Sequence, residues 1–301
     1  MKSRILIFTD WYEPGYKAGG PIQSVKNIVS RFSELYDFYV LTSNRDLGDL
    51  LPYKDIPADQ WIQRNSMENI WYAAPGSMNR INLDSIFKQV QPDIVYFNSM
   101  FSSRFTIVPL WILIRRRFQG RLIIAPRGML HAGALKRKTL KKKIFLKVFK
   151  LLGWSQRLQF HATDQQEYED IIHYFSRDSR IIIAENIPNL NRNKWTSRHK
   201  VPGALTCVFI SRIHRKKNLH YILEIFKELK GGGKISFDIY GETDDPVYAR
   251  KCERIIKELP SNISVNFKGP VSHREVFEIL ERYHLFILPT LGENFGHSIF
   301  E

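Results

Sequence analysis

Two cations, Arg212 and Lys217, have the types and the spacing to hold a phosphate in the segment SRIHRKKN (211–218). A strand is predicted over 205–211 and a helix over 217–230, so both cations meet in one loop beside a helix N-terminus, where free N–H groups favour an anion. A diphosphate fits, because arginine can grip it with two hydrogen bonds and lysine adds a point charge. A solvated basic turn explains the stretch equally well, since two further basic residues lie in the same loop.

Two carboxylates, Glu293 and Glu301, lie in the last stretch of the sequence, LGENFGHSIFE. A strand is predicted before them, and a helix is predicted to start within HSIFE. Gly292 and Gly296 let the backbone come close to a ligand, and the N–H groups of residues 296–299 would face it. Glu293 could accept hydrogen bonds from sugar hydroxyls, and Glu301 could accept a pair from a ribose diol. Two ordinary carboxylates that complement a helix dipole are the simpler interpretation, and the spacing alone favours it.

Apolar runs rich in Ile, Val and Phe alternate with helical patterns along the whole chain, which favours parallel sheets covered on both faces. Strands are predicted first at 4–9, 38–43, 70–74, 93–98, 121–126, 157–162 and 180–185, and later at 205–211, 234–240, 263–269 and 285–290. We expect an α/β protein with two Rossmann-like, doubly wound domains that face each other across a cleft. The predicted parts are an N-terminal domain over 1–185, a polar linker over 186–204 and a C-terminal domain over 205–301.

The net charge of +15 requires an anionic complement, and phosphates on nucleotide, nucleic acid or lipid fit best. The excess is densest in residues 135–152, where eight lysines and arginines fall within 136–150. The segment predicts a surface helix with a buried apolar stripe formed by Leu140, Ile144, Val148, Leu151 and Leu152. Its basic remainder suits docking on an anionic membrane. Nucleic acid is the competing partner, but no aromatic platform or recognised motif supports it.

The remaining composition favours a cytoplasmic protein. The sequence has no run of about 18 uncharged apolar residues, so a membrane span is not expected. The opening MKSRILIFTD reads as a first strand and not as a secretory signal. Cys207 and Cys252 form no metal-ligand spacing and suggest no disulfide framework. We expect a cytoplasmic location, with the basic segment able to hold the protein on the inner face of the membrane.

Taken together and in this order, SRIHRKKN and ENFGHSIFE resemble the retaining nucleotide-sugar glycosyltransferases of the GT-B fold, family four (glycosyl transferases group one). That family carries an Arg-x4-Lys pair after the first strand of its C-terminal domain and a Glu-x7-Glu motif after a later strand. The other segments that resemble the family are YEPGYKAGGPIQSVKNI (12–28), IAENIPN (183–189), YGETDD (240–245) and VNFKGPVSHREVFEIL (265–280). The resemblance covers nearly the whole chain and implies two Rossmann-like domains of the GT-B type.

The resemblance implies a role for each matching residue. Arg212 and Lys217 would hold the donor diphosphate and neutralise the leaving group. Glu293 would bind hydroxyls of the donor sugar, and Glu301 would hold the ribose. The implied backbone contacts are Phe295 and Gly296 near the sugar, Ser298 and Ile299 at the phosphate with His297 beside them, Gly269, Pro270 and Val271 along the base, and Gly19 and Gly20 facing the diphosphate or acceptor. No cofactor and no metal are expected, and the acidic pair Asp244 and Asp245 is interpreted as solvated.

The sequence departs from the family pattern in two places. Many members have a histidine near the end of the strand that corresponds to 121–126, facing the donor sugar. This chain has APRGMLHAG there, with Arg127 at the strand end and His131 four residues later. We assign the family position to His131, although a lone loop histidine is more often structural or solvated. Family members also continue past the position of Glu301 with further αβ units, so we expect a C-terminally truncated chain whose second domain is incomplete.

The leading hypothesis is a retaining hexosyltransferase that moves a sugar from a nucleoside diphosphate to a glycan or lipid-linked acceptor. Surface polysaccharide or glycoconjugate synthesis would be its setting. One alternative is a catalytically impaired fragment that binds nucleotide or anionic membrane without turnover. Another is a nucleotide-sugar epimerase of similar fold, which the combination of the two motifs makes less favourable.

Overall fold

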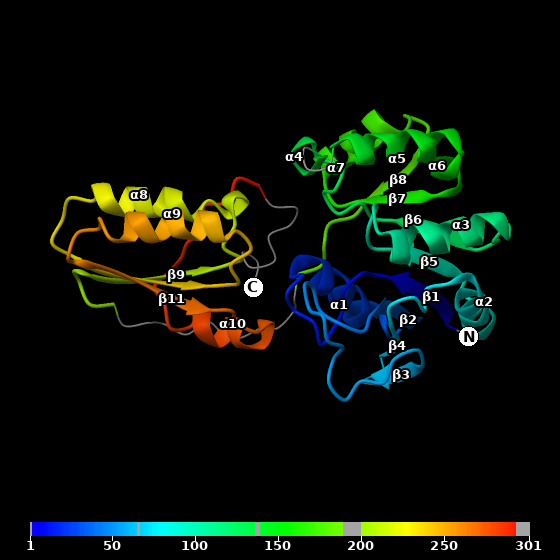
Figure 1. The fold of residues 1–301 in the computed structure, drawn as a ribbon, viewed down its shortest axis with the longest axis horizontal. Coiled ribbons are helices and arrows are strands. Elements are labelled where there is room, and N and C mark those ends of the chain that lie inside the picture. Colours follow the sequence, from blue (N-terminus) through cyan, green and yellow to red (C-terminus); the bar gives the residue numbers. More distant parts are fainter. Residues whose placement is uncertain (1, 65–66, 136–138, 189–199, 293–301) are drawn as a thin grey trace. The chain divides into compact units, whose positions relative to one another are not determined.

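The computed structural model describes residues 2–64, 67–135, 139–188 and 200–292. The chain divides into two compact units, Met1–Asn189 and Leu190–Glu301, and each holds one sheet (Figure 1). We describe each unit by itself and call them unit 1 and unit 2. The predicted linker over 186–204 stays a prediction, because residues 189–199 lie outside the described part of the chain.

Unit 1 contains an eight-stranded sheet of order β3-β4-β2-β1-β5-β6-β7-β8. Neighbouring strands pair in parallel, except that β3 pairs antiparallel with β4 at one edge. The strands are β1 (Ser3–Phe8), β2 (Tyr36–Ser43), β3 (Trp61–Arg64), β4 (Glu68–Ala73), β5 (Ile94–Phe97), β6 (Arg121–Ile124), β7 (Gln159–Ala162) and β8 (Arg180–Ile183). The sequence pattern misses β3, because this short edge strand has no apolar run of its own.

The helices of unit 1 cover both faces of this sheet. They are α1 (Gly20–Phe32), α2 (Arg80–Val90), α3 (Val108–Arg115), α4 (Ala132–Leu135), α5 (Thr139–Leu151), α6 (Trp154–Arg157) and α7 (Gln165–Tyr174), with a π-helical turn at Ser103–Ile107 before α3. Alternation along β1 separates the two cores, because Leu6 and Phe8 point to one face and Ile7 to the other. The Leu6 face packs against α2, α3, α5 and α7, and the Ile7 face packs against α1.

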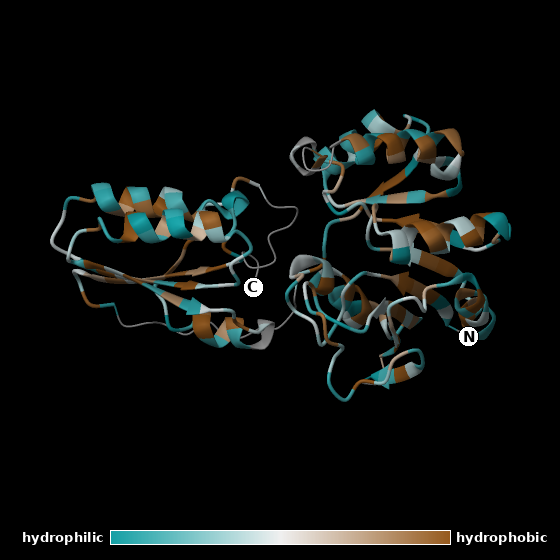
Figure 2. Cartoon of the chain, in the orientation of Figure 1, coloured by the Kyte–Doolittle hydropathy of each residue, from teal (hydrophilic) through white to brown (hydrophobic). Residues whose placement is uncertain are grey.

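Unit 2 repeats the arrangement with a four-stranded parallel sheet of order β11-β10-β9-β12. Its strands are β9 (Ala204–Ile210), β10 (Lys234–Tyr240), β11 (Ile263–Gly269) and β12 (Leu285–Phe286), and its helices are α8 (Leu219–Glu228), α9 (Pro246–Ile256) and α10 (His273–Leu280). One core joins β9 and β10 to α8 and α9, and a smaller one joins β9 to α10. Figure 2 shows the hydrophobic colour gathered in the strands, while the helices carry both colours. The predicted α/β class with Rossmann-like parallel sheets is confirmed.

Helix α5 corrects the predicted burial of the basic segment. The predicted stripe is exposed: Leu140 is 73% and Leu151 85% accessible, and Ile144 and Val148 are exposed too. The buried side carries Leu146 and Phe149, with the half-buried Phe145, and the Phe149 ring packs on the rings of Trp154 and Phe175. Both the aliphatic stripe and the stripe with the two phenylalanines recur at helical spacing. The second is the buried one, because its aromatic rings remove more apolar area from water. No helix among the described residues is long and apolar enough to cross a bilayer.

Candidate functional site

The strand order of unit 2 identifies the position at the edge of its sheet where a ligand can bind. Chain progression runs from β9 through β10 to β11 in one direction, and β12 then joins β9 on the other side. In open parallel sheets such a switch in strand order leaves a crevice outside the carboxyl ends of the two strands, which is where ligands bind. The loop after β9 carries Arg212 and Lys217, and the segment after β12 leads to Gly292.

These two loops are in direct contact. The backbone N–H of Leu291 donates to the carbonyl oxygen of Lys216 at 2.9 Å. The hydroxyl of Thr290 donates to the same oxygen at 3.2 Å. The structure thus joins Arg-x4-Lys to the segment that enters Glu-x7-Glu, although about 80 residues separate the two motifs in the sequence. The predicted site residues Glu293, Phe295, Gly296, His297, Ser298, Ile299 and Glu301 lie outside the described residues.

The loop after β10 packs tightly on the loop after β9. Gly241 has φ 149°, and a Cβ at this position would lie 2.0 Å from the carbonyl oxygen of Ser211, so only glycine fits here. A parallel bridge between Ile213 and Thr243 continues the contact. The N–H of Gly241 donates to the carbonyl of Gly269 at 2.9 Å. The segment Gly269–Val271, including Pro270, therefore lies at the same edge of the sheet as Arg212.

Ion pairs connect the basic loop to the acidic loop after β10. Arg212 Nη1 contacts Asp244 Oδ2 at 2.8 Å, and Arg215 Nε contacts Asp245 Oδ2 at 2.8 Å. The Asp245 carboxylate also caps α9 by accepting the N–H of Tyr248 at 3.0 Å. This hydrogen bond from the Tyr248 backbone is the main reason that the pKa of Asp245 lies below its usual value, and the hydrogen bond and charge of Arg215 contribute less. Both aspartates thus remain accessible to solvent and are also paired with arginine, a pairing that the sequence could not show without the strand order.

The basic side chains stay available to an anion, whereas most nearby amides do not. The side chains of Arg212 and Arg215 are 45% and 67% exposed. A guanidinium has five N–H donors, so the bond to Asp244 leaves others on Arg212 for a phosphate. The N–H groups of Lys216, Lys217 and His220 are instead bound to His214 or to the hydroxyl of Tyr248. The expected free N–H groups are thus mostly satisfied within the protein, and the side chains carry the binding potential.

Lys217 occupies the junction between this loop and α8. It ends a 3-10 turn, Arg215–Lys217, and the next residue, Asn218, takes the left-handed conformation with φ 59° that opens α8. The helix therefore begins two residues later than predicted. Lys217 still belongs to the loop that carries Arg212, after the carboxyl end of β9.

Unit 1 also has its switch in strand order between β1 and β5. Gly19 caps α1 with φ 65°, and Gly20 is the first helical residue. Asn98 follows β5 and connects it to the start of α1, because its Nδ2 donates to the carbonyl of Pro21 at 3.1 Å. At the end of β1, Asp10 accepts the hydroxyl of Ser102 at 2.6 Å, and burial raises the pKa of this carboxyl. Sequence reasoning misses Asn98 and Asp10, which follow their strands without any spacing motif.

Arg127, at the end of β6, is buried with only 9% accessibility. Its guanidinium donates to Asn98 Oδ1 at 2.8 Å, to the Tyr96 hydroxyl at 2.7 Å and to Asn186 Oδ1. The Tyr96 hydroxyl meets His161 Nδ1 at 2.8 Å. Tyr96 donates in this contact, because the proton of the neutral His161 ring lies on Nε2, which faces the Ala184 carbonyl oxygen, and Nδ1 can only accept. Arg127 thus acts as the centre of a buried polar network.

The orientation of His161 follows from this network. Its Nε2 lies 2.8 Å from the carbonyl oxygen of Ala184 and must therefore carry the proton. Burial, reinforced by the nearby Arg127 charge, lowers the pKa of His161 to about 4. The ring is neutral at neutral pH, and the hydrogen bonds run in one direction from Arg127 to Ala184.

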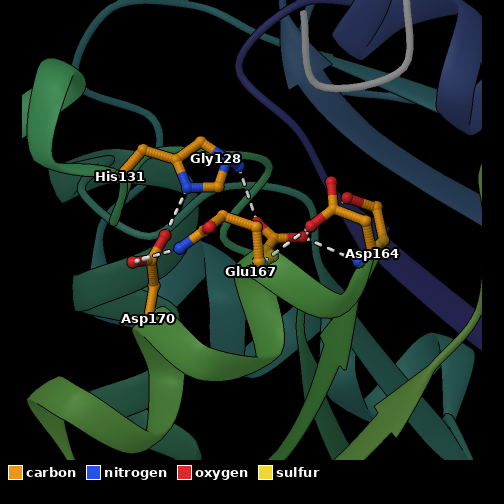
Figure 3. A network of polar contacts seen from close by, with 7 residues as sticks. Gly128, His131, Asp164, Glu167 and Asp170 are labelled. Atoms are coloured by element: carbon orange, nitrogen blue, oxygen red, sulfur yellow. Dashed lines mark hydrogen bonds and ion pairs between the residues drawn. The ribbon is translucent and has the colours of Figure 1, made fainter.

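His131 lies beyond the end of β6 and is held by α7 (Figure 3). Its Nδ1 contacts Asp170 Oδ2, which leaves Nε2 as the nitrogen that can meet a ligand. One turn earlier, Glu167 accepts the N–H of Gly128 at 2.6 Å and both the N–H and the hydroxyl of Thr163 at 2.8 Å. Asp164 caps the helix by accepting the Glu167 N–H at 2.7 Å. The D-x-x-E pattern at 164–167 was the sequence signal for this support.

The predicted site residues thus fall into separate groups. Arg212, Lys217 and the segment Gly269–Val271 share the carboxyl edge of the sheet in unit 2. Gly19, Gly20 and His131 lie at the corresponding edge in unit 1. Over the described ranges, no group of three or more His, Cys, Asp or Glu side chains is arranged to hold a metal. Cys207 and Cys252 are buried free thiols, and burial raises the pKa of each to about 11.

Comparison with known proteins agrees with this architecture. Residues 191–301 match the family described as Glycosyl transferases group 1. Similar structures include HepE from Anabaena in complex with UDP and glucose, with a TM-score of 0.69 and 14% identity over 99% of this chain and 77% of that one. Sucrose-phosphate synthase from Thermosynechococcus elongatus gives 0.65 and 13% over 99% and 79%. A glycosyltransferase from Rickettsia africae gives 0.63 and 12% over 96% and 73%.

None of the curated proteins matches the chain. At these identities the similar structures establish the fold and leave the substrates open. The family match over residues 191–301 and the shared fold together support a glycosyltransferase of the GT-B fold.

Proposed function

We propose that the chain transfers a sugar, with retention, from a nucleoside-diphosphate donor to a glycan or lipid-linked acceptor. One observation carries the proposal: the Arg212–Lys217 loop is hydrogen-bonded to the segment before Glu293 at the switch in strand order of unit 2. A crevice of this kind is where Rossmann-like sheets bind nucleotides. HepE, whose fold is similar, was crystallised with UDP and glucose, which favours a uridine nucleotide as the first donor to test.

The proposed reaction exchanges one bond at the anomeric carbon for another. The bond between the sugar carbon and the diphosphate oxygen breaks, and a bond to an acceptor hydroxyl oxygen forms on the same face of the sugar. As the acceptor oxygen bonds to the sugar carbon, the acceptor hydroxyl loses its proton, and this proton passes to the departing diphosphate. Arg212 and Lys217 stabilise the negative charge that grows on that diphosphate, which is electrostatic catalysis without a metal.

The remaining roles follow the resemblance and belong to the same proposal. Glu293 binds the donor sugar, Glu301 binds the ribose, and the backbone of residues 295–299 contacts sugar and phosphate. Gly269–Val271 borders the base, which is supported by the bond that ties Gly269 to the loop after β10. In unit 1 we assign Gly19 and Gly20 to the diphosphate or acceptor. His131 serves the donor sugar, and its ring is fixed for that role by Asp170.

Nucleotide titration of the Lys217→Ala variant tests the donor site. Lys257→Ala is the matched control, because Lys257 follows α9 and lies near the amino ends of the same strands. Calorimetry with a panel of nucleoside diphosphates, beginning with UDP, should show at least tenfold weaker binding for Lys217→Ala, or about 1.4 kcal/mol. Lys257→Ala should bind like the wild type. Equal affinities in all three proteins would exclude Lys217 from the site, and NMR of the product anomer tests retention separately.

The surface of helix α5 supports the proposal that the protein binds an anionic membrane and finds its acceptor there. On a helical wheel, the exposed residues Leu140, Ile144, Val148 and Leu151 form one stripe, with Lys141 on one side and Lys147 on the other. An exposed apolar stripe between lysines is the pattern of helices that lie in the membrane interface. We propose that α5 places the protein on the cytoplasmic face of an anionic membrane, where a lipid-linked acceptor in polysaccharide or glycoconjugate synthesis would be found.

Vesicle sedimentation separates the two contributions of α5. Lys143→Gln with Lys147→Gln removes charge, and Ile144→Ser with Leu151→Ser removes apolar contact. Each pair should lower binding to phosphatidylglycerol vesicles, by roughly 1 kcal/mol per lysine for the charge pair. Lys230→Gln with Lys257→Gln removes the same charge from unit 2 and should have no effect. Equal binding of the wild type to phosphatidylcholine vesicles would contradict electrostatic docking.

A further inference from the structure

A second cationic site lies at the opposite edge of the unit 1 sheet from His131 and Arg127. A cavity of about 430 Å³ opens there between the end of α3, the end of α6 and the first residues of β6 and β8. Arg117, Arg157 and Arg180 line it together. Because parallel strands begin at one edge and end at the other, this cavity is separate from every residue assigned to sugar transfer in unit 1.

The charge around the cavity is not balanced by the protein. None of the nine residues that line it is acidic. The three arginine side chains are exposed, and none of them forms an ion pair with another described residue. Two other arginines of unit 1 do form ion pairs: Arg116 pairs with Asp84, and Arg64 pairs with Glu13. Three like charges around one hollow repel one another, so an anion that enters it gains from all three.

The floor of the cavity is apolar, which narrows the ligand class. Ile114, Phe118 and Leu122 lie beneath the arginines, and Gln156 adds one polar amide at the rim. Arg117 also takes the left-handed conformation with φ 53° at the end of α3, a position that glycine or asparagine usually fills. That backbone turn carries the chain directly to Phe118, so the cationic rim and the apolar floor come from one tight connection.

We propose that this cavity binds the phosphate group of a phosphorylated ligand, with the guanidinium groups on the phosphate and the apolar floor under the part of the ligand that adjoins it. Arginine suits this role, because its planar fork forms paired hydrogen bonds with phosphate oxygens. The exposed end of α5, at Leu151 and Leu152, lies four residues before Gln156 in the sequence. A lipid phosphate is therefore one source of the ligand, and a free phosphorylated metabolite is the other. The inference does not depend on the proposed sugar transfer.

Titration of the full chain with soluble phosphates tests the site. The probes are dihexanoyl phosphatidic acid below its micelle concentration and glycerol 3-phosphate, and dihexanoyl phosphatidylcholine, whose phosphate charge is balanced by its choline, serves as the zwitterionic reference. The variant is Arg157→Gln with Arg180→Gln. Its matched control is Arg115→Gln with Arg177→Gln, which removes the same charge from exposed positions of unit 1 outside the cavity.

The wild type and the control should bind phosphatidic acid at least tenfold more tightly than the cavity variant. Tighter binding of phosphatidic acid than of glycerol phosphate assigns a lipid source, and equal binding assigns a free phosphate; both support the site. An equal loss in the control and the cavity variant, or equal binding of phosphatidylcholine, overturns the proposal. A circular dichroism spectrum and a urea unfolding midpoint equal to those of the wild type would show that the cavity variant is folded, and this control does not depend on the donor site.

Discussion

The two units treat polar side chains in opposite ways. Among the described residues, seventeen polar or charged side chains are buried in unit 1, including Asp46, Glu68, Arg127 and Glu167, whereas Asp238 is the one such residue in unit 2. Unit 2 keeps Arg212 and Arg215 at the edge of the sheet, exposed and paired with aspartates. Buried polar networks fix one arrangement of the chain, while exposed cations can bind a ligand without refolding. Changes of charge at the buried positions of unit 1 should therefore act on stability, and those at the exposed arginines of unit 2 on affinity.

The largest effect is expected at Arg127. Arg127→Met removes three hydrogen bonds and leaves Asn98, Asn186 and Tyr96 buried without their donor. The free energy of unfolding of unit 1 should fall by about 3 kcal/mol, because unsatisfied buried polar groups are costly. Urea unfolding followed by circular dichroism measures it, and the exposed Arg177→Met serves as the control. A loss no greater than that of the control would mean that the network does not stabilise unit 1.

Glu68 offers a pH test of the same contrast. Burial raises its pKa to about 7, although Tyr12 donates a hydrogen bond to it at 2.5 Å. The folded state therefore holds a proton that the unfolded state has already lost, and stability falls as pH rises from about 4.5 to 7. Glu68→Gln should remove this dependence, so that the variant gains on the order of 2 kcal/mol over the wild type between pH 5 and pH 8.

The comparison at two pH values isolates Glu68 from other buried groups. The lowered pKa of His161 gives the opposite slope, because stability is lost as pH falls from about 6.5 toward 4. His161 contributes equally to the wild type and to Glu68→Gln, so it cancels in their difference. A difference in unfolding free energy that is the same at pH 5 and pH 8 would argue against a raised pKa at Glu68.

In unit 2, Arg212→Ala should separate affinity from stability. The side chain is half exposed and its one ion pair is at the surface, so the free energy of unfolding should change by less than about 1 kcal/mol. Affinity for a nucleoside diphosphate should drop about tenfold, because a charge-assisted contact to phosphate is lost. Calorimetry and urea unfolding on the same preparation give both numbers. A variant that unfolds easily but binds normally would reverse the contrast between the units.

The smallest effect is expected at Asp244. Asp244→Asn removes the carboxylate that competes with phosphate for Arg212 and keeps the size of the side chain. Stability should change by less than about 0.5 kcal/mol, as for other surface ion pairs. Nucleoside diphosphate affinity should rise two- to threefold, and the gain should vanish in an Arg212→Ala background. A loss of affinity would instead indicate that Asp244 orients Arg212 for its ligand.

The elements with continuous apolar runs were predictable from the sequence, because buried parallel strands need no other signal. Strands such as β10 and β11 appear at their predicted bounds. The position of Arg212 and Lys217 on the same loop also follows from the sequence, because the strand that precedes them is clear. The side of α5 that is buried could not be predicted. Two stripes share the same period there, and only the aromatic neighbours Trp154 and Phe175 decide between them.

Partners distant in sequence account for the rest. Arg127 stands visibly at a strand end, but its burial depends on Asn98 and Asn186, which reach it through the order of the strands. The contact of His131 with Asp170 joins the loop after β6 to helix α7 in the same way. No periodicity reports such contacts, because each joins the ends of elements that only the sheet brings together.

The bond between Leu291 and Lys216 uses main-chain atoms on both sides. Its strength is therefore indifferent to the side chains at these two positions, which can change in size or charge while the loops stay joined. Proline at 291 is the exception, since it has no N–H to give. Side chains around these loops can thus change one at a time, and with them the base or sugar that the proposed donor site accepts, while the main-chain contact between the loops stays the same.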